Sequence, residues 1–217
     1  MLRVKPGEAI ECFDGRGRRY RGAVARVSDR ELAVQVETRA DDPPPKLAIT
    51  LAQSLIKPEH FEWAIQKATE LGAARILPLL AERSTVRAAE HGSANRLARW
   101  ARIAEAAVAQ CGRARVPAIE SPQGVSEALT SLRGGRGLFL TPAETGRPIA
   151  DAARELVGAG EATIFIGPEG DFSPSEIAAA KQAGLMPVRL GPNAVRAETA
   201  AVAALVVVQC LAGEWHV

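Results

Sequence analysis

Chemistry that many enzymes depend on is scarce in this chain. Its three cysteines, Cys12, Cys111 and Cys210, lie far apart, with no C-x-x-C pair and no histidine at ligand spacing. That pattern argues against a disulfide framework or a metal site and is typical of a protein in a reducing cytoplasm. The longest apolar run, residues 200–208, is too short to cross a bilayer, and the first eight residues contain no apolar signal core. We therefore expect a cytoplasmic protein that neither enters a membrane nor binds a metal.

Motifs for several common reactions are also missing. The three histidines, His60, His91 and His216, lie beside no nucleophile motif, and the lack of a G-x-S-x-G elbow argues against a Ser-His-Asp hydrolase. A phosphate loop of the form G-x-x-x-x-G-K-[ST] and a strand-linked G-x-G-x-x-G are absent too. Triphosphate and dinucleotide chemistry therefore lose support.

The composition is that of an ordinary globular protein. The chain has 217 residues, of which 47% are hydrophobic and 24% charged, enough for one large domain or two modest ones. Its net charge of +2 is unevenly distributed, because Lys and Arg outnumber Asp and Glu by three within residues 1–40 and by four within 95–116. Two basic surfaces suggest a polyanionic partner, although a solvated helix face and a charged loop explain the same counts.

The first forty residues have a different pattern of apolar segments from the rest of the chain. Apolar bursts at 9–13, 22–27 and 31–36, separated by turn residues, predict a small antiparallel β unit. The proline run at 43–45 suits neither a strand nor a helix, so we place a boundary there, with domains at 1–43 and 46–217. Beyond it, strands are expected at 47–51, 74–80, 138–141, 163–166 and 187–190, and helices at 58–71, 94–110, 149–157, 174–183 and 198–211. This alternation predicts a mostly parallel sheet covered on both faces.

The most informative segment is residues 162–170, Ala-Thr-Ile-Phe-Ile-Gly-Pro-Glu-Gly. An apolar strand ends here in a tight turn, where Gly167 and Gly170 allow close approach and positive φ, and Pro168 stiffens the backbone. Ser173-Pro174-Ser175-Glu176 then predicts a capping box that starts a helix. Open α/β sheets hold ligands at loops of this kind, so the turn predicts a cofactor site.

A second loop of the same kind spans residues 190–199. Arg196 projects from it just before a helix, a typical place for an anion contact. Glu198 and Thr199 open that helix and could equally serve as caps that complement its dipole. Two further segments stay open between a surface role and a ligand role: the helix at 59–72 with its Lys67–Glu70 pair, and Glu82-Arg83-Ser84 after the next strand.

Five segments occur in a fixed order along the chain: Gln66-Lys67-Ala68-Thr69-Glu70-Leu71-Gly72, Glu82-Arg83-Ser84, Gln110-Cys111-Gly112-Arg113-Ala114-Arg115-Val116-Pro117, Ile166-Gly167-Pro168-Glu169-Gly170, and Leu190-Gly191-Pro192 with Arg196-Ala197-Glu198-Thr199-Ala200. Together they closely resemble the ribosomal RNA small subunit methyltransferase E family over nearly the whole chain. The resemblance implies methyl transfer from S-adenosylmethionine to N3 of a uridine in 16S ribosomal RNA.

The resemblance also implies a fold and partners. It implies a SPOUT-class α/β domain with a parallel sheet and a trefoil knot, a rare exception to un-knotted chains, preceded by a PUA-like β-barrel that binds RNA. It implies a homodimer, with the active site at the subunit interface, that acts on 16S rRNA or the small ribosomal subunit. The expected cofactor-binding residues are Leu140, Thr141, Ile166, Gly167, Pro168, Glu169, Gly170, Leu190, Gly191, Val195, Arg196 and Thr199. The expected RNA-binding residues are Arg16, Arg18, Arg19, Arg21, Arg83, Arg113 and Arg115.

The chain departs from the family at two places. It begins at a point that resembles the interior of the family's β domain, so an opening strand or two is expected to be absent, leaving an incomplete barrel with an exposed sheet edge. The last motif, usually Arg-Ile-Leu-Arg-Thr-Glu-Thr, here is Asn193-Ala194-Val195-Arg196-Ala197-Glu198-Thr199. The second arginine of the motif is kept and the first is lost.

The expected catalytic residues are Arg196 and Glu198. Uridine N3 is a poor nucleophile until its proton leaves, so the enzyme must stabilise a uracil anion. Arg196 suits that role and cannot be the base, since a guanidinium stays protonated, whereas Glu198 is the nearest motif carboxylate that could accept the proton. Rival interpretations are another SPOUT RNA methyltransferase acting on tRNA or another rRNA site, a non-catalytic RNA-binding protein, and a metabolic α/β enzyme.

Overall fold

The computed structural model describes residues 4–85, 94–132, 136–141 and 146–215. The chain divides into two compact units, one of residues 1–44 with 112–116 and the other of residues 45–111 with 117–217. The short segment 112–116, predicted within the second domain, has its contacts within the first unit. Two of the three histidines, His91 and His216, lie outside the described residues.

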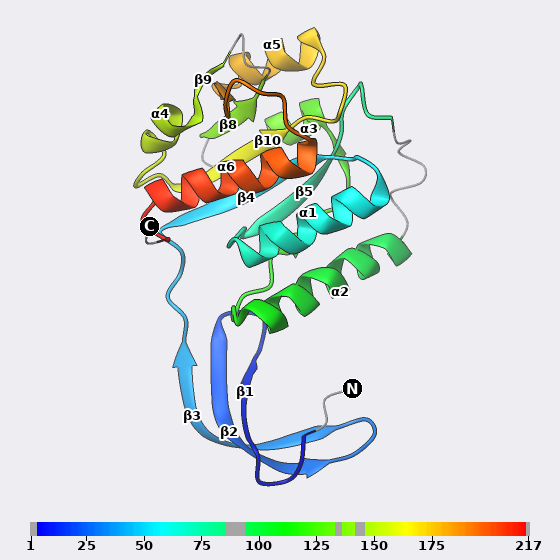
Figure 1. Cartoon of the computed structure of the whole chain (residues 1–217), viewed down its shortest axis with the longest axis vertical. Helices are drawn as coiled ribbons and strands as arrows, with labels where there is room; N and C mark the ends of the chain where they lie inside the picture. The colour runs from blue at the N-terminus through cyan, green and yellow to red at the C-terminus, as the bar shows by residue number, and fades with distance from the viewer. Residues whose placement is uncertain (1–3, 86–93, 133–135, 142–145, 216–217) are drawn as a thin grey trace. The chain divides into compact units, whose positions relative to one another are not determined.

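The first unit is built on three antiparallel strands in the order β1-β2-β3 (Figure 1). The strands are β1 (Ala9–Phe13), β2 (Arg18–Val27) and β3 (Leu32–Asp41). The β1–β2 turn is held by Asp14, whose Oδ1 accepts hydrogen bonds from the amides of Arg16 (2.7 Å) and Arg18 (3.1 Å). Within the described residues of this unit the sheet stays open, because β1 and β3 pair only with β2.

The second unit contains a parallel sheet in the order β6-β5-β4-β10-β8-β11-β9, with β7 beside β5. Its strands are β4 (Leu47–Ser54), β5 (Arg75–Leu80), β6 (Ala118–Ile119), β7 (Gln123–Gly124), β8 (Gly137–Leu140), β9 (Arg147–Pro148), β10 (Gly160–Ile166) and β11 (Met186–Arg189). Its helices are α1 (Pro58–Glu70), α2 (Ala94–Cys111), α3 (Val125–Thr130), α4 (Ile149–Arg154), α5 (Pro174–Gln182) and α6 (Ala197–Leu211). The expected parallel α/β fold is confirmed, while β6, β7, β9 and α3 were not predicted because each is very short.

Helices pack in two groups around this sheet (Figure 1). In one group α6 contacts both α1 and α4, and α1 contacts α2; in the other, α3 contacts α5. The central strand β4 is fully buried at Ile49 and Leu51, as expected for a strand covered on both faces. Beside α3 and α5 the core contains a run of three aromatic rings, in which Phe139 lies 5.8 Å from Phe165 and 4.2 Å from Phe172 between centroids.

The helix ends follow local sequence rules. Gly72 takes φ 92° just after α1, and the Ala73 amide donates to the Ala68 carbonyl, which closes the helix as a Schellman motif. The expected capping box of α5 is confirmed, since Ser173 Oγ accepts from the Glu176 amide and Glu176 Oε2 accepts from the Ser173 amide. No helix in the described part of the chain combines the length and the apolarity needed to span a membrane.

Candidate active site

Four neighbouring parallel strands end at one edge of the second unit's sheet. In the order β4-β10-β8-β11, Gln53 is paired with Ile166, Phe165 with Phe139, and Leu140 with Val188. Because parallel strands point the same way, the chain that follows each of them emerges at this edge. The edge therefore brings together the residues expected at the cofactor: Leu140 and Thr141 after β8, Ile166 to Gly170 after β10, and Leu190 onward after β11.

The loop after β10 has unpartnered backbone donors. The amides of Gly167, Glu169 and Gly170 have no hydrogen-bond acceptor among the described residues, while the Asp171 amide closes the turn onto the Pro168 carbonyl (3.0 Å). Neither glycine uses the positive φ that glycine allows: Asp171 takes the left-handed conformation, with φ 57°. Free amides in a row of this kind suit acceptor atoms of a ligand.

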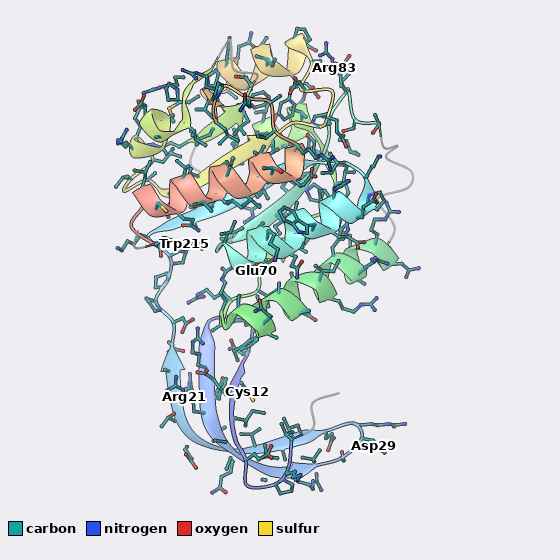
Figure 2. All side chains as sticks on the ribbon, viewed as in Figure 1. Cys12, Arg21, Asp29, Glu70, Arg83 and Trp215 are labelled. Carbon is teal, nitrogen blue, oxygen red and sulfur yellow. The ribbon has the colours of Figure 1, made fainter. Side chains whose placement is uncertain are left out.

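Neighbouring chain atoms lie so close to positions 167 and 170 that glycine is favoured at both. A Cβ on Gly167 would lie 3.1 Å from the Phe172 ring, and one on Gly170 would lie 3.3 Å from Cβ and the carbonyl oxygen of Arg83. Arg83, labelled in Figure 2, also donates from Nη1 to the Gly170 carbonyl (3.3 Å). The turn after β5 is thus packed directly against the loop after β10, and Arg83 contacts that loop.

Glu82, next to Arg83, fixes the same turn to α5. Its amide donates to Glu176 Oε1 (2.9 Å), and its Oε2 accepts a hydrogen bond from the Ser175 hydroxyl (3.3 Å). The segment 82–84, left open between a ligand role and a structural role, therefore has structural contacts on both sides. These contacts fix the turn after β5, which packs against the loop after β10, and do not by themselves identify a ligand.

The end of β11 is held on both sides by the connection between β8 and β9. The Thr141 amide donates to the Val188 carbonyl (2.9 Å), and Arg189 Nε donates to the Gly146 carbonyl (3.0 Å). A Cβ on Gly146 would meet the Val188 carbonyl carbon at 2.5 Å, so only glycine fits at that approach. The chain leaving β11 toward residue 196 thus starts from a tightly fixed point.

Arg196 is the N-cap residue of α6, and its side chain is exposed. Its carbonyl accepts from the Ala200 amide (2.8 Å), but no side chain caps the helix, so neither Glu198 nor Thr199 acts as a hydrogen-bonding cap. Glu198 lies in the first turn, where a carboxylate complements the helix dipole. No partner among the described residues binds the Arg196 guanidinium, which leaves its charge available at the edge.

Glu198 has a partner that the sequence analysis missed. Its Oε1 lies 3.1 Å from Nδ1 of His60, in the first turn of α1. Gln53 and Ser54 were not predicted as site residues either; they end β4 at the same edge and are almost completely buried. Gln53 Oε1 and Ser54 Oγ have no hydrogen-bond partner in the described structure, an arrangement that calls for a ligand or water. The rule that ligands bind at strand ends, applied to β4, would have pointed to all three residues.

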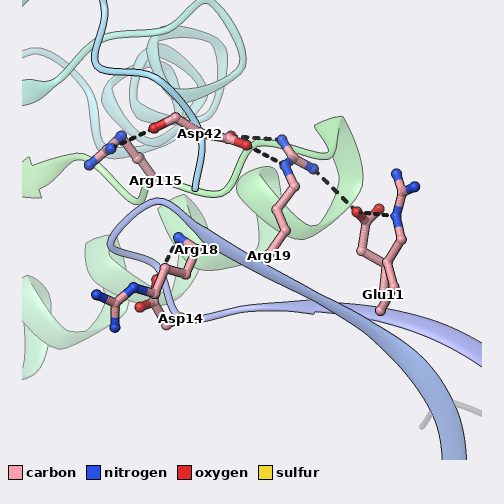
Figure 3. A network of polar contacts seen from close by, with 7 residues as sticks. Glu11, Asp14, Arg18, Arg19, Asp42 and Arg115 are labelled. Atoms are coloured by element: carbon pink, nitrogen blue, oxygen red, sulfur yellow. Dashed lines mark hydrogen bonds and ion pairs between the residues drawn. The ribbon is translucent and has the colours of Figure 1, made fainter. Parts of the chain in front are cut away.

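In the first unit, two of the arginines expected at RNA are bound internally (Figure 3). Arg19 forms a two-pronged ion pair with Asp42, at 2.6 Å from Nε to Oδ1 and 2.9 Å from Nη2 to Oδ2. Arg115 donates to the carbonyls of Arg16 (2.7 Å) and Asp42 (2.9 Å). The Arg19 guanidinium holds the pKa of the Asp42 carboxyl below its ordinary value. These arginines join the β1–β2 turn to the end of β3 and to segment 112–116.

Three of the other arginines expected at RNA are more accessible. Arg21, labelled in Figure 2, pairs with Glu11 at 3.1 Å but has a side chain 72% exposed. Arg18 pairs with Asp41 at 3.1 Å and is about half exposed, and Arg16 is exposed. Arg113 is half-buried. A polyanion approaching this turn would therefore meet Arg16, Arg18 and Arg21 more readily than Arg19 or Arg115.

Comparison with known proteins gives the family of this chain. Two family models match the chain: an RNA methyltransferase domain over residues 43–209 and an RNA methyltransferase PUA domain over residues 2–37. Ribosomal RNA small subunit methyltransferase E of Mycobacterium bovis is 34% identical over 219 residues, covering 99% of this chain and 83% of the relative. The chain belongs to this family. The Synechocystis member is 30% identical over 213 residues, covering 97% of this chain and 69% of the relative.

Solved structures of the family share the fold. The ribosomal RNA small subunit methyltransferase E of Neisseria gonorrhoeae, crystallised with bound S-adenosyl methionine, superposes with a TM-score of 0.85 at 32% identity, covering 96% of this chain and 85% of that one. The SPOUT-type α/β fold with an N-terminal PUA-like unit is thereby confirmed. In the described residues the PUA-like unit is an open three-stranded sheet, in agreement with the expected incomplete barrel and exposed sheet edge.

Proposed function

We propose that this chain transfers the methyl group of S-adenosylmethionine to N3 of a uridine in 16S ribosomal RNA. The observation that carries the proposal is the set of loops that follow β10, β8 and β11 at one sheet edge, with the exposed Arg196 among them. Membership of the family supports RNA methyl transfer, and the cofactor bound to the Neisseria relative supports the methyl donor. The choice of N3 follows from the family resemblance in the five ordered segments.

The residues at this edge fit the proposed cofactor. The free amides of Gly167, Glu169 and Gly170 offer donors to ring and ribose acceptors, and the half-buried Leu140 provides apolar surface of the kind that lines nucleoside sites. The unpaired Gln53 and Ser54 oxygens add polar groups that a ligand or its waters would satisfy. When bound, the cofactor supplies an electrophilic methyl group on a positively charged sulfur. Among the described residues no cluster of three metal-ligating side chains occurs, so no metal enters the proposal.

Arg196 would stabilise the negative charge that develops on uracil when N3 loses its proton. Its position at the N-cap of α6 adds the positive end of the helix dipole to its own charge. A guanidinium stays protonated, so this residue positions and stabilises the anion but does not accept the proton. Thr199 and Val195, on either side of Arg196 in the same loop and helix start, complete the expected cofactor wall.

The proposal includes the assembly that the family resemblance implies. Support for a trefoil knot is the strand order, in which β11 lies between β8 and β9 although these two are consecutive in the sequence. We further propose a homodimer that acts on 16S rRNA or the small subunit in the cytoplasm, with Arg16, Arg18 and Arg21 as the phosphate contacts of the first unit.

The proposal is tested by methyl transfer from radiolabelled S-adenosylmethionine to small ribosomal subunits from a strain without the modification, with tRNA as the parallel substrate. We expect label only in 16S rRNA, together with calorimetric binding of the cofactor. Label in tRNA would support a different SPOUT enzyme, and RNA binding without cofactor binding would support a non-catalytic role. Light scattering tests the homodimer separately.

A further inference from the structure

We propose that His60 accepts the uracil N3 proton, and that Glu198 orients the imidazole. The inference rests on the proposed function and reverses the sequence-based assignment, in which Glu198 itself was the acceptor. The observation behind it is the 3.1 Å contact between His60 Nδ1 and Glu198 Oε1, two residues from helices that pack against each other.

Both members of this pair stand at defined points of the fold. His60 is in the first turn of α1, where its amide donates to the Lys57 carbonyl at 3.0 Å. Glu198 is the second residue of α6, two positions after Arg196. The pair therefore joins the beginnings of two helices, one that follows β4 and one that follows β11.

The location of the pair is at the sheet edge of the candidate site. β4 ends at Ser54 and is paired with β10 up to the Gln53–Ile166 level, directly before the Gly167–Gly170 loop. His60 follows β4 by one short connection, as Glu198 follows β11 by the loop that contains Arg196. The imidazole thus belongs to the same edge as the cofactor loops.

The contact with Glu198 distinguishes the two ring nitrogens. A carboxylate only accepts, so the 3.1 Å approach of Nδ1 to Oε1 favours the tautomer with its hydrogen on Nδ1. In the neutral ring Nε2 is then the acceptor, which is the tautomer that a general base requires. The exposed fractions agree with this division, because the Glu198 side chain is only 12% exposed whereas that of His60 is 33% exposed. The less exposed carboxylate orients the ring, and the more accessible imidazole can reach a substrate.

The proposed step conserves atoms and charge. Nε2 of His60 takes the proton from uracil N3, and the N3 electron pair forms the new bond to the methyl carbon. The bond between that carbon and sulfur breaks, and its electrons remain on sulfur, which becomes a neutral thioether. The imidazolium, stabilised by Glu198, later releases its proton to water. Arg196 offsets the negative charge on the uracil oxygens while N3 is deprotonated.

Two substitutions at His60 separate a base from a structural contact. His60→Asn keeps a side-chain N–H that can donate to Glu198 but has no basic nitrogen, and His60→Ala removes both groups. We expect each to lower kcat for methylation of small subunits by about 100-fold, the usual scale of general base catalysis, with the KM values for cofactor and RNA within about threefold. Added imidazole should restore part of the kcat of His60→Ala. The matched control is Glu59→Gln, which alters an exposed charge in the same helical turn and should leave kcat unchanged.

The outcome that overturns the inference is a His60→Asn variant with kcat near that of the wild type. His60 would then only hold Glu198 in place. A second contradicting outcome is a loss of cofactor affinity in calorimetry that fully accounts for the lost rate. Failure of the proposed function looks different, because the unaltered protein itself would then form no N3-methyluridine.

Discussion

The arginines around the β1–β2 turn and the arginine at the start of α6 have opposite surroundings. Arg19 of β2 and Arg115 of segment 112–116 bind Asp42 and backbone carbonyls, so they join three chain segments within the first unit. At α6, the Arg196 guanidinium has no partner among the described residues, and it follows β11 at the sheet edge where the loop with free amides follows β10. A count of positive charges in the sequence therefore overstates the charge that a partner can meet, because ion pairs and hydrogen bonds within the protein bury part of it.

The two regions also differ in how they are held. The turn in the first unit depends on charge-assisted hydrogen bonds, which are sensitive to pH and salt. The loop after β10 depends on close packing, with Gly170 against Arg83 and Gly167 against Phe172. Substitutions should therefore affect stability in the first region and catalysis or cofactor affinity in the second.

The largest effect is expected from Arg196→Ala. Removing a preorganised charge at the reacting group should lower kcat by about 100- to 1000-fold. Cofactor affinity measured by calorimetry should change by less than about threefold, because the amides of the loop after β10 remain. Arg19→Ala is the matched control, and it should leave kcat nearly unchanged. Full activity in Arg196→Ala, with activity lost in Glu198→Gln, would contradict the roles given to these two residues.

A moderate effect is expected from Gly170→Val. The new side chain must displace Arg83, whose Cβ would lie 3.3 Å from the first added carbon, so the loop shifts. We expect the cofactor Kd to rise by about tenfold, equivalent to about 1.4 kcal/mol. Gly124→Val is a suitable control because no atom lies within 4 Å of its Cβ position. An unchanged Kd in Gly170→Val would remove this loop from the cofactor site.

A smaller effect should distinguish Arg19 from Arg21, two arginines of β2. Arg19→Ala should lower the free energy of unfolding of the first unit by about 1–2 kcal/mol, since it breaks a two-pronged charged pair. Arg21→Ala should leave stability within about 0.5 kcal/mol of wild type, because its ion pair is exposed. It should instead weaken RNA binding and reduce its salt dependence. Chemical unfolding and RNA titrations at several salt concentrations distinguish the two, and a stability loss in Arg21→Ala alone would reverse the assignment.

The smallest expected effect is on how the stability of the first unit depends on pH. The pKa of Asp42 is lowered on folding, chiefly by its hydrogen bond to Arg19. Its contribution to stability is therefore complete above the ordinary value of 3.8 and is lost as the pH falls through the lower folded-state value. Asp42→Asn should be less stable at neutral pH and should show a weaker decline in acid. Thermal unfolding across acidic pH checks this, with Asp29→Asn as the control; equal acid dependence in wild type and Asp42→Asn would exclude the ion pair as the cause.

Much of the second unit could be predicted from the sequence, because its signals are local. The capping box at Ser173 and the glycine after α1 each depend on neighbouring residues, and both are confirmed. The short strands β6 and β9 could not be predicted, since two residues give no period and their pairing is set by distant strands. The left-handed residue was not indicated by the sequence either: the turn closes onto the Pro168 carbonyl, and the positive φ lies at Asp171 rather than at a glycine.

Contacts between residues distant in sequence could not be predicted from the sequence. His60 and Glu198 are separated by most of the second unit, and nothing in either local pattern indicates the other. Likewise, the charge count near Arg19 gave no sign that Asp42 would neutralise it. What the sequence indicated well was the sheet edge itself, because a strand followed by a glycine-rich turn is a local feature with a general structural meaning.

The central claim is methyl transfer to N3 of one uridine in 16S rRNA. The most direct test is nucleoside mass spectrometry of small subunits after incubation with the protein and S-adenosylmethionine, followed by mapping of the modified position. The account predicts N3-methyluridine at a single position, with no product from the Arg196→Ala variant in the same time. A methyl group on a ribose hydroxyl, or no methylated nucleoside despite cofactor binding, would contradict it.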